Sequence, residues 1–400
     1  MSNVSINRQI GSIFVVIGTE VGAGILALPI LIAHMGLPLG CCIMLVAWCL
    51  MTYTALLICE ANLASSDGSS FAGMAKELLP PIGRFGVWVS FLLLLYTILV
   101  AYISAAGSAF NTTFPIGQHK ISLIFVIVLG SFVVMGIKAV DWVNRLLLGT
   151  KLLLLIFVCV ILLPNVHLDH LTVSFFNSKI LLVALPVFVT AFSSHLIIPT
   201  LRTYLQSDAK VLSRVIIIGS IIPLILYLIW IIGVLGVIPL TGEHSFSQLF
   251  AKTHDANVGD ILSLMKINLH NEVFYSPVSL FSNISVTTSF LGVSLALYHF
   301  LIDAFRLKRL NLVRKNILAI FLTFLLPLFI VWFFPNIFIK ALGYVGLCCS
   351  VLLIIIPFFM IKTLRKRNHV FKIKWVNNNF FLYLSLILGC LVIIIQLFDM

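Results

Sequence analysis

The chain has 400 residues, of which 61% are hydrophobic and only 10% are charged, and its formal net charge is +12. A soluble domain carries about 25% charged residues, so these polar groups are too few to cover a water-facing surface. The positive charge does not indicate binding to nucleic acid, because the basic residues lie in short loops between apolar segments. The composition therefore predicts an all-α, polytopic membrane protein.

Eleven apolar segments are each long enough to cross about 30 Å of hydrocarbon as a helix. The first is too long and too interrupted for a cleaved signal peptide, so we interpret it as a retained span. Two polar stretches, residues 65–82 and 241–275, are expected to form short helices outside the membrane. Spanning helices are predicted at residues 10–34, 38–62, 84–110, 121–139, 144–164, 179–203, 212–238, 276–304, 313–334, 338–361 and 379–398.

Basic residues lie mainly on one side of this layout. With the N-terminus inside, 20 Lys and Arg residues fall in inner loops and 5 in outer loops. An excess of Lys and Arg in short loops marks the cytoplasmic side of a membrane protein. The N-terminus is therefore expected in the cytoplasm, and the C-terminus, after eleven spans, on the outer side.

The first predicted span contains the sequence VIGTEVGAGILALPI, residues 16–30, with three glycines in seven residues and the acid Glu20 at its middle. Such a stretch is expected to break a helix. Freed backbone groups at membrane depth cost several kcal/mol each unless something satisfies them. The amides of Ala23 and Gly24 would suit a carboxylate, and the carbonyls near Ile17 and Gly18 an ammonium group. Alternatively, the glycines only let helices pack closely.

A second segment, VFVTAFSSHLIIPTLRTYL at residues 187–205, matches the first when Pro199 is aligned with Pro29, an offset of 170 residues. Two interrupted spans in corresponding positions indicate an inverted-repeat transporter. The spacing predicts five spans per repeat within one transmembrane domain, residues 1–400. Repeat one covers about 10–164, repeat two about 179–361, and an extra helix about 379–398.

Three motifs carry a resemblance to a known family: GTEVGAGILALPI, ALPVFVTAFSSHLIIPTLRTYL and TTSFLGVSLALYHFLIDAF. They resemble the bacterial aromatic amino acid permeases, the tyrosine- and tryptophan-specific group of the amino acid–polyamine–organocation superfamily. The resemblance covers essentially the whole chain. It implies a leucine-transporter-type fold and proton-coupled uptake (symport) of an aromatic L-amino acid, tyrosine foremost, across a bacterial inner membrane. One departure is Glu20, where family members usually have an uncharged residue.

We expect the substrate to bind at the two breaks. Tyr102 on the third span and Phe290 on the eighth would line an aromatic pocket, or simply pack in the core. His195 would titrate or bond a substrate hydroxyl, or be a buried histidine with its hydrogen bonds satisfied. The ring of Phe192 would cover the substrate as a gate, or face lipid. The other expected substrate-binding residues are Gly18, Thr19, Glu20, Gly22, Ala23, Gly24, Thr190 and Ser193.

Two charges at membrane depth are hypotheses for proton coupling, because such charges are rare and expensive. Desolvation disfavours a charged carboxyl group, so Glu20 suits a proton carrier, or else it caps freed amides. Lys151 either snorkels to the surface or has the role that the resemblance implies. In that role its ammonium replaces the sodium ion of related carriers and bridges the first and eighth spans near Thr287 and Thr288.

Other functions lack sequence support. No HExxH or GxSxG motif and no paired carboxylates indicate an enzyme, and no continuous polar stripe indicates a channel. All eight cysteines lie in apolar runs without metal-ligand spacing, so neither a metal nor a cofactor is predicted. The expected partners are an aromatic amino acid, a proton and the lipid bilayer, with the chain as a monomer. A tryptophan carrier, a broader amino acid permease and a sodium-coupled symporter remain alternatives.

Overall fold

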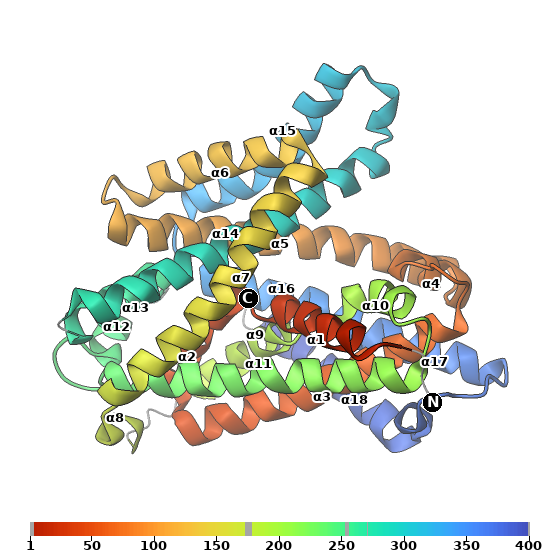
Figure 1. The fold of residues 1–400 in the computed structure, drawn as a ribbon, viewed down its shortest axis with the longest axis horizontal. Helices are drawn as coiled ribbons and strands as arrows, with labels where there is room; N and C mark the ends of the chain where they lie inside the picture. The colour runs from red at the N-terminus through yellow and green to blue at the C-terminus, as the bar shows by residue number, and fades with distance from the viewer. Residues whose placement is uncertain (1–3, 173–177, 253–255, 270, 399–400) are drawn as a thin grey trace.

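The computed structural model describes residues 4–172, 178–252, 256–269 and 271–398, without the side chains of residues 137, 178–183, 252 and 272. Within these ranges the chain forms helices, turns and loops and contains no strand. The long helices run broadly alongside one another, with α6 and α15 along one edge of the bundle and α18 along another (Figure 1). The architecture is therefore all-α, as the sequence predicts.

Each of the eleven predicted spans contains a helix, or a pair of helices, of spanning length. Within the described residues, ten helices are long and apolar enough to cross a membrane, and one bent pair makes an eleventh span. The unbroken spans are α3 (Leu37–Ala64), α5 (Pro81–Thr113), α6 (Gln118–Met135), α7 (Ile137–Leu162), α11 (Ala209–Val237), α14 (Glu272–Ala304), α15 (Leu312–Phe333) and α18 (Asn379–Phe398). The tenth span consists of α16 (Phe338–Cys349), a π-helical turn (Ser350–Ile355) and α17 (Ile356–Lys366).

Short helices occupy the two polar stretches, as predicted. The first stretch holds α4 (Phe71–Leu78), and the second holds α12 (Phe246–Lys252) and α13 (Val258–Leu269). Residues 253–255 and 270 of the second stretch lie outside the described residues. The remaining short elements are η2 (Leu163–Asn165), α8 (Leu168–Thr172), η4 (Leu307–Arg309) and η6 (Lys374–Asn377).

Local chemistry explains where several helices begin. The Asp208 carboxylate accepts hydrogen bonds from the amides of Lys210 and Val211 at 3.0 and 3.1 Å and so caps α11. Such caps satisfy amides that a helix start leaves free. Between α6 and α7, Gly136 has a φ of 99°. Glycine adopts this conformation without steric cost, so one residue joins the two spans. The prediction that the fifth span begins at residue 144 was therefore wrong by seven residues.

Two spans are broken, and their breaks have the same local design. The first consists of α1 (Ile6–Glu20), the 3-10 turn η1 (Ala23–Ala27) and α2 (Leu28–Met35), with a bend of 46°. The sixth consists of α9 (Ser178–Ala191), η3 (His195–Ile197) and α10 (Ile198–Tyr204). In both spans a 3-10 turn leads into a helix whose second residue is proline. Proline fits there because that amide has no intrahelical acceptor.

The half-helix α10 is fixed to its surroundings by Arg202, whose side chain is buried. The guanidinium donates hydrogen bonds to the carbonyls of Asn62, Ser65 and Ser66, and it forms an ion pair with Asp67. Hydrogen bonds from a charged donor are roughly twice as strong as neutral ones. The end of α3 and the loop before α4 therefore hold α10 in place.

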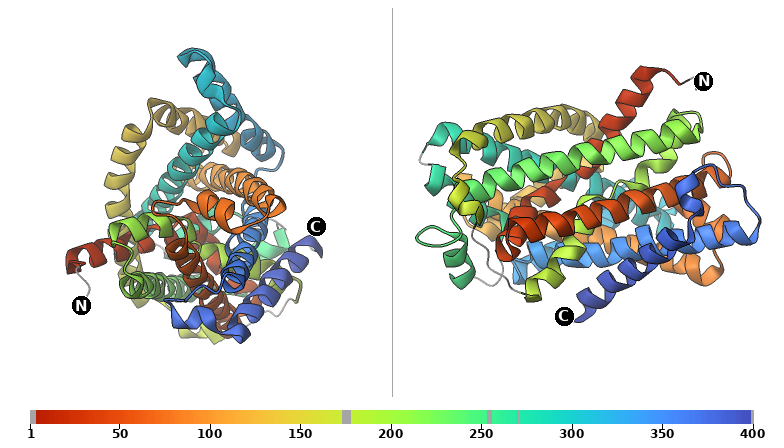
Figure 2. Two further views of the ribbon diagram at one scale, coloured as in Figure 1. Left: turned by 90° about the vertical axis from the view of Figure 1, so that its right-hand side faces the viewer. Right: turned by 90° about the horizontal axis from the view of Figure 1, so that it is seen from below.

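The first turns of α1 are held without a buried ion pair, by packing and by a cation–π contact of Arg8 with the ring of Tyr204. These turns project from the bundle (Figure 2), and Ile6 and Phe14 are 71% and 57% exposed. The packing of α1 is strongest near the break, where Val16 lies against Gly219 of α11. A Cβ atom on that glycine would come within 2.7 Å of Val16 Cβ. The half-helices α1 and α10, which lie at the same end of the bundle as α4, thus differ in how firmly they are held.

The crossing of α16 and α9 gives a test of the packing. A Cβ atom at Gly346 would lie 2.2 Å from the carbonyl oxygen of Pro186, a backbone atom that cannot swing aside. Overpacking typically costs about 1–3 kcal/mol, so Gly346→Ala should lower the melting temperature of the protein in detergent. At Gly86 of α5 nothing lies within 4 Å, and Gly86→Ala should not lower it. Equal melting of wild type and Gly346→Ala would contradict the contact.

Candidate functional site

The two breaks lie side by side. Glu20 ends α1, and its Oε1 atom accepts a hydrogen bond of 2.7 Å from the hydroxyl of Ser194, which precedes η3. Glu20 is only 6% exposed, and its Oε2 atom has no hydrogen-bond partner within the described structure. Buried polar atoms are normally paired. This oxygen therefore has unused hydrogen-bonding capacity.

Tyr227 of α11 connects the two breaks. Its hydroxyl lies 2.6 Å from the carbonyl oxygen of Glu20 and 3.1 Å from that of Ala191, the last residue of α9. Both carbonyls lack an intrahelical donor, because each belongs to the last turn of a helix. Tyr227 is fully buried. Its single hydroxyl hydrogen is therefore shared between carbonyl groups of the two half-helices, and the carbonyl of Glu20 also accepts from the amide of Gly22 at 2.7 Å.

The start of the second half of the first span, at η1, faces α14 and α5. The amide of Ala23 donates a hydrogen bond of 3.1 Å to Ser289 Oγ. A Cβ atom at Gly22 would lie 3.4 Å from the same Ser289 oxygen and 3.8 Å from the hydroxyl of Tyr102. A side chain at residue 22 would therefore crowd these two hydroxyl groups, which explains the glycine.

Open space lies beside Gly24, where a Cβ atom would meet nothing within 4 Å. Gly18 and Thr19 precede the break and differ from Gly24 in their surroundings. A Cβ atom at Gly18 would lie 3.2 Å from Leu148 of α7, so this position packs closely. Thr19 is exposed, and its hydroxyl donates to the carbonyl of Val15. Among these three positions, Gly24 is the one beside which the structure leaves room for a side chain.

Lys151 contacts the first break and does not snorkel. It is 2% exposed, and its Nζ atom donates a hydrogen bond of 2.5 Å to the carbonyl of Val21. The hydroxyls of Thr287 and Thr288 donate within their own helix, to the carbonyls of Asn283 and Ile284. Lys151 forms no ion pair with Glu20, since neither residue has one in the described structure.

The predicted residues of the sixth span surround its break in different ways. The hydroxyls of Thr190 and Ser193 each donate at 2.7 Å to a carbonyl three residues earlier. Phe192 is buried with its ring centre 5.5 Å from that of Tyr227. His195 is fully buried, and its Nε2 atom is hydrogen-bonded to Thr54 Oγ1 at 2.9 Å. Phe192 therefore does not face lipid here, and one nitrogen of His195 is satisfied.

Of the two residues expected to line an aromatic pocket, only Tyr102 lies at a break. Tyr102 is half-buried and directs its hydroxyl toward Gly22. Phe290 is fully buried between Phe125 and Phe324, with ring centres 4.8 and 5.9 Å away. Phe290 is therefore a packing residue in this structure, whereas Tyr102 lies at the break.

Three residues at the breaks were not predicted as site residues: Ser194, Tyr227 and Ser289. Tyr227 carries a usable signal, because it is a lone hydroxyl in the apolar run LILYLIW, and a buried tyrosine hydroxyl needs a partner. Ser194 is the residue that aligns with Gly24 in the repeat comparison. Ser289 directly follows the two threonines that were predicted. Of the consecutive residues Thr287, Thr288 and Ser289, the helical register of α14 decides which one faces the break.

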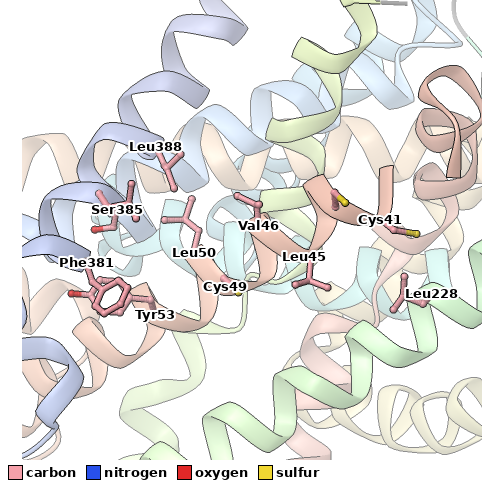
Figure 3. A pocket seen from close by; sticks show the side chains of 12 residues that line it. Cys41, Leu45, Val46, Cys49, Leu50, Tyr53, Leu228, Phe381, Ser385 and Leu388 are labelled. Atoms are coloured by element: carbon pink, nitrogen blue, oxygen red, sulfur yellow. The ribbon is translucent and has the colours of Figure 1, made fainter. Parts of the chain in front are cut away.

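A cavity of about 570 Å³ lies elsewhere, between α3, α11 and α18. Figure 3 shows that its wall on α3 includes Cys41, Val46 and Cys49, with Leu228 and Leu388 on the other helices. No side chain around it carries a permanent charge. Ligand sites combine apolar walls with a few convergent polar groups, so this groove fits a zwitterion less well than the breaks do.

Comparison with known proteins identifies the family. The sequence profile of the tryptophan/tyrosine permease family matches residues 5–396. The chain belongs to this family. It is therefore a multi-pass membrane permease, and the resemblance stated from the three motifs is confirmed.

Full-length relatives of this permease carry different substrate names. It is 31% identical to the tyrosine-specific transport system 1 of Haemophilus influenzae, over 96% of each chain. It is 30% identical to the tryptophan-specific transport protein of the same organism, over 97% of this chain and 95% of the relative. It is also 30% identical to glutamine transporter 2 of Aliivibrio fischeri, over 98% of this chain and 99% of the relative.

Tyr227→Phe tests whether this hydroxyl stabilises the breaks of the permease. The carbonyl of Glu20 keeps a hydrogen bond of 2.7 Å from the amide of Gly22, so loss of the hydroxyl leaves the buried carbonyl of Ala191 unsatisfied, at a cost of about 1–3 kcal/mol. We expect a lower melting temperature in detergent. Tyr344→Phe in α16 is the matched control, because Tyr344 makes no hydrogen bond within the described structure, and its melting should not change. If both variants melt like wild type, Tyr227 does not hold the breaks.

Proposed function

We propose that this permease is a secondary active transporter that takes up an aromatic L-amino acid, foremost tyrosine, in symport with protons. The observation that carries the proposal is the meeting of two broken spans at Glu20 and Ser194 in a chain of this family. The tyrosine- and tryptophan-specific relatives support an aromatic substrate. The bacterial inner membrane is the proposed location, with the permease as a monomer.

The proposed fold is the leucine-transporter type, with repeats at about 10–164 and 179–361 and an extra helix at 379–398. The shared order of a 3-10 turn, a helix start and a proline at both breaks supports this repeat. The concentration of Lys and Arg at inner loops supports a cytoplasmic N-terminus and a periplasmic C-terminus. These assignments place α1, α4 and α10 at the cytoplasmic end.

The proposed substrate site is the space beside Gly24. An amino acid carboxylate there would meet the amide of Gly24, in the first turn of a helical segment where amides lack intrahelical acceptors. The free Oε2 atom of Glu20 would accept from the ammonium group, and Tyr102 would border the ring. Gly18, Thr19, Gly22, Ala23, Thr190, Phe192, Ser193 and His195 form the rest of the proposed surroundings, and Phe290 supports them by packing.

The relative named for glutamine favours a second candidate, a broader amino acid permease. Competition in proteoliposomes separates the two. A site that hydrogen-bonds a substrate hydroxyl rejects an analogue without it strongly, whereas apolar size discrimination is weak. If tyrosine is the substrate, tryptophan and phenylalanine should compete poorly with labelled tyrosine, and glutamine and leucine should not compete. Efficient competition by glutamine or leucine would overturn the aromatic assignment.

Gly24→Val tests the position of the site. The open space beside Gly24 accepts the valine side chain without a clash, so the folded protein should be retained. The same side chain would occupy the proposed site and should abolish binding of labelled tyrosine. Gly11→Val on the same span is the control, because nothing lies within 4 Å there either, and it should bind normally. Unchanged affinity in Gly24→Val would refute this placement.

Proton coupling is proposed to rest on Glu20 and Lys151. Lys151 would stand in for a cation at the break by holding the carbonyl of Val21, with Thr287 and Thr288 on the neighbouring helix. An ammonium group at that place also repels a sodium ion, which favours protons over sodium as the coupling ion. Glu20 would take up or release its proton as its free oxygen gains or loses a partner.

Glu20→Gln and Lys151→Met identify the coupling residue. The variant that removes it should lose accumulation driven by a pH gradient but keep equilibrium exchange, because exchange needs no net proton movement. Both activities are measured with labelled substrate in proteoliposomes, with and without the gradient. If both variants still concentrate substrate, neither residue carries the proton. Wild-type accumulation that requires sodium and ignores pH would reject proton coupling as a whole.

A further inference from the structure

A second cavity, of about 610 Å³, lies at the end of the molecule that holds α4 (Figure 1). Its walls come from α4, α5, η3 and α14. Trp88 and Phe91 of α5 and Phe300 of α14 line it with rings, and Lys76 of α4 and Arg84 of α5 add positive charge. The volume falls in the range of small-molecule sites. The cavity thus combines an aromatic wall with two cations.

Two helices that line the cavity, α5 and α14, also pass the candidate site. Tyr102 and Ser289 both lie close to Gly22 at the first break. Phe91 lies eleven residues before Tyr102 in α5, and Phe300 lies eleven residues after Ser289 in α14. Eleven residues are about three helical turns, or about 16 Å, so each ring shares a helix face with its partner at the break.

Two small residues of α14 lie between the break and the cavity. Gly292 and Ala296 lie three and seven residues after Ser289, on the face that leads to Phe300. Both are exposed, and a Cβ atom at Gly292 would meet nothing within 4 Å. Leu196 of η3, directly after the second break, also lines the cavity. Small side chains on α14 and Leu196 thus lie between the breaks and the cavity.

The two cations at the cavity have N–H groups that form no ion pair in the described part of the chain. Arg84 uses its Nε atom to donate to the carbonyl of Leu79 at 3.0 Å. Its other N–H groups, and the ammonium of Lys76, form no ion pair in the described part of the chain. Arg84 lies eighteen residues, or five turns, before Tyr102, and so on the same helix face. A carboxylate is the natural partner of such a guanidinium group.

The aromatic wall suits a planar ring. The ring centre of Phe300 lies 5.6 Å from that of Trp88 and 5.5 Å from that of Phe91. Aromatic groups at these separations attract one another beyond simple burial of area. A ligand with a ring at one end and a carboxylate at the other matches both parts of the cavity.

We propose that this cavity is a second substrate-binding site, which receives the aromatic amino acid between the breaks and the cytoplasm. The ring lies against Trp88, Phe91 and Phe300, and the carboxylate pairs with Arg84 and Lys76. The proposal rests on the proposed function. An anionic phospholipid would offer the same negative charge, but these rings lie on the faces of α5 and α14 that lead to the break, which favours the transported amino acid.

Sided exchange kinetics test the proposal. The full-length permease is reconstituted in one orientation, and the half-saturating tyrosine concentration is measured from each side. Arg84→Gln should raise the cytoplasmic value about tenfold and leave the outer value within about twofold, since losing a hydrogen bond to a charged group weakens binding by at least that factor. Trp88→Leu removes an aromatic contact and should raise the cytoplasmic value severalfold, again without changing the outer value. Arg84→Lys keeps the charge and should restore most of the affinity.

Matched controls are Arg309→Gln in η4 and Trp142→Leu in α7, because both residues are exposed and neither lines the cavity. Both should behave like wild type. Unchanged cytoplasmic values in Arg84→Gln and Trp88→Leu, with binding still lost in Gly24→Val, would overturn the second site and leave the proposed function intact. An effect that vanishes in vesicles of phosphatidylcholine alone would make the cavity a lipid site. A wild-type protein that exchanges no aromatic amino acid would overturn both proposals.

Discussion

The structure depends on one constraint: two helices are interrupted where no bulk water can satisfy their backbone. Each unsatisfied amide or carbonyl at membrane depth costs several kcal/mol. Three intact helices supply the missing partners. Lys151 of α7 donates to Val21, and Ser289 of α14 accepts from Ala23. The one hydroxyl hydrogen of Tyr227 in α11 is within reach of a carbonyl at each break. The breaks can persist without a ligand because these side chains replace the lost helical hydrogen bonds.

The same arrangement leaves little for a ligand to satisfy. Most freed groups are already paired, and the unpaired Oε2 atom of Glu20 and the open space beside Gly24 stand out. A ligand therefore gains binding energy from a few well-placed polar contacts, and specificity must come largely from the walls. The nearest walls carry the hydroxyl groups of Tyr102 and Ser289 rather than further charges. Such a site distinguishes ligands by hydroxyl chemistry and shape.

Much of the fold was predictable because lipid imposes simple rules on sequence. Span number followed from apolar length, and both breaks followed from clustered glycine or serine before a proline. For Lys151, the sequence could predict a contact with the first span, because the residue lies deep in the membrane. It could not predict the partner, the carbonyl of Val21, because that depends on which backbone group the break leaves unpaired. The role of Phe290 could not be predicted, because the sequence of a span does not show whether an aromatic side chain packs against another ring, here Phe125, or faces a ligand.

The two half-helices at the α4 end differ in a way that bears on how the protein moves. Displacing α10 would strip a buried guanidinium of several hydrogen bonds. The first turns of α1 are held by packing along α11 and by a cation–π contact of Arg8 with Tyr204. A rotation of α1 about residues 21 and 22 is therefore the inexpensive motion, and Lys151 grips the chain at that pivot. A charged ammonium group holds a carbonyl more strongly than a neutral amine does. Release of its proton would loosen the pivot, and by reciprocity a change in the angle of α1 would alter how tightly Lys151 keeps that proton.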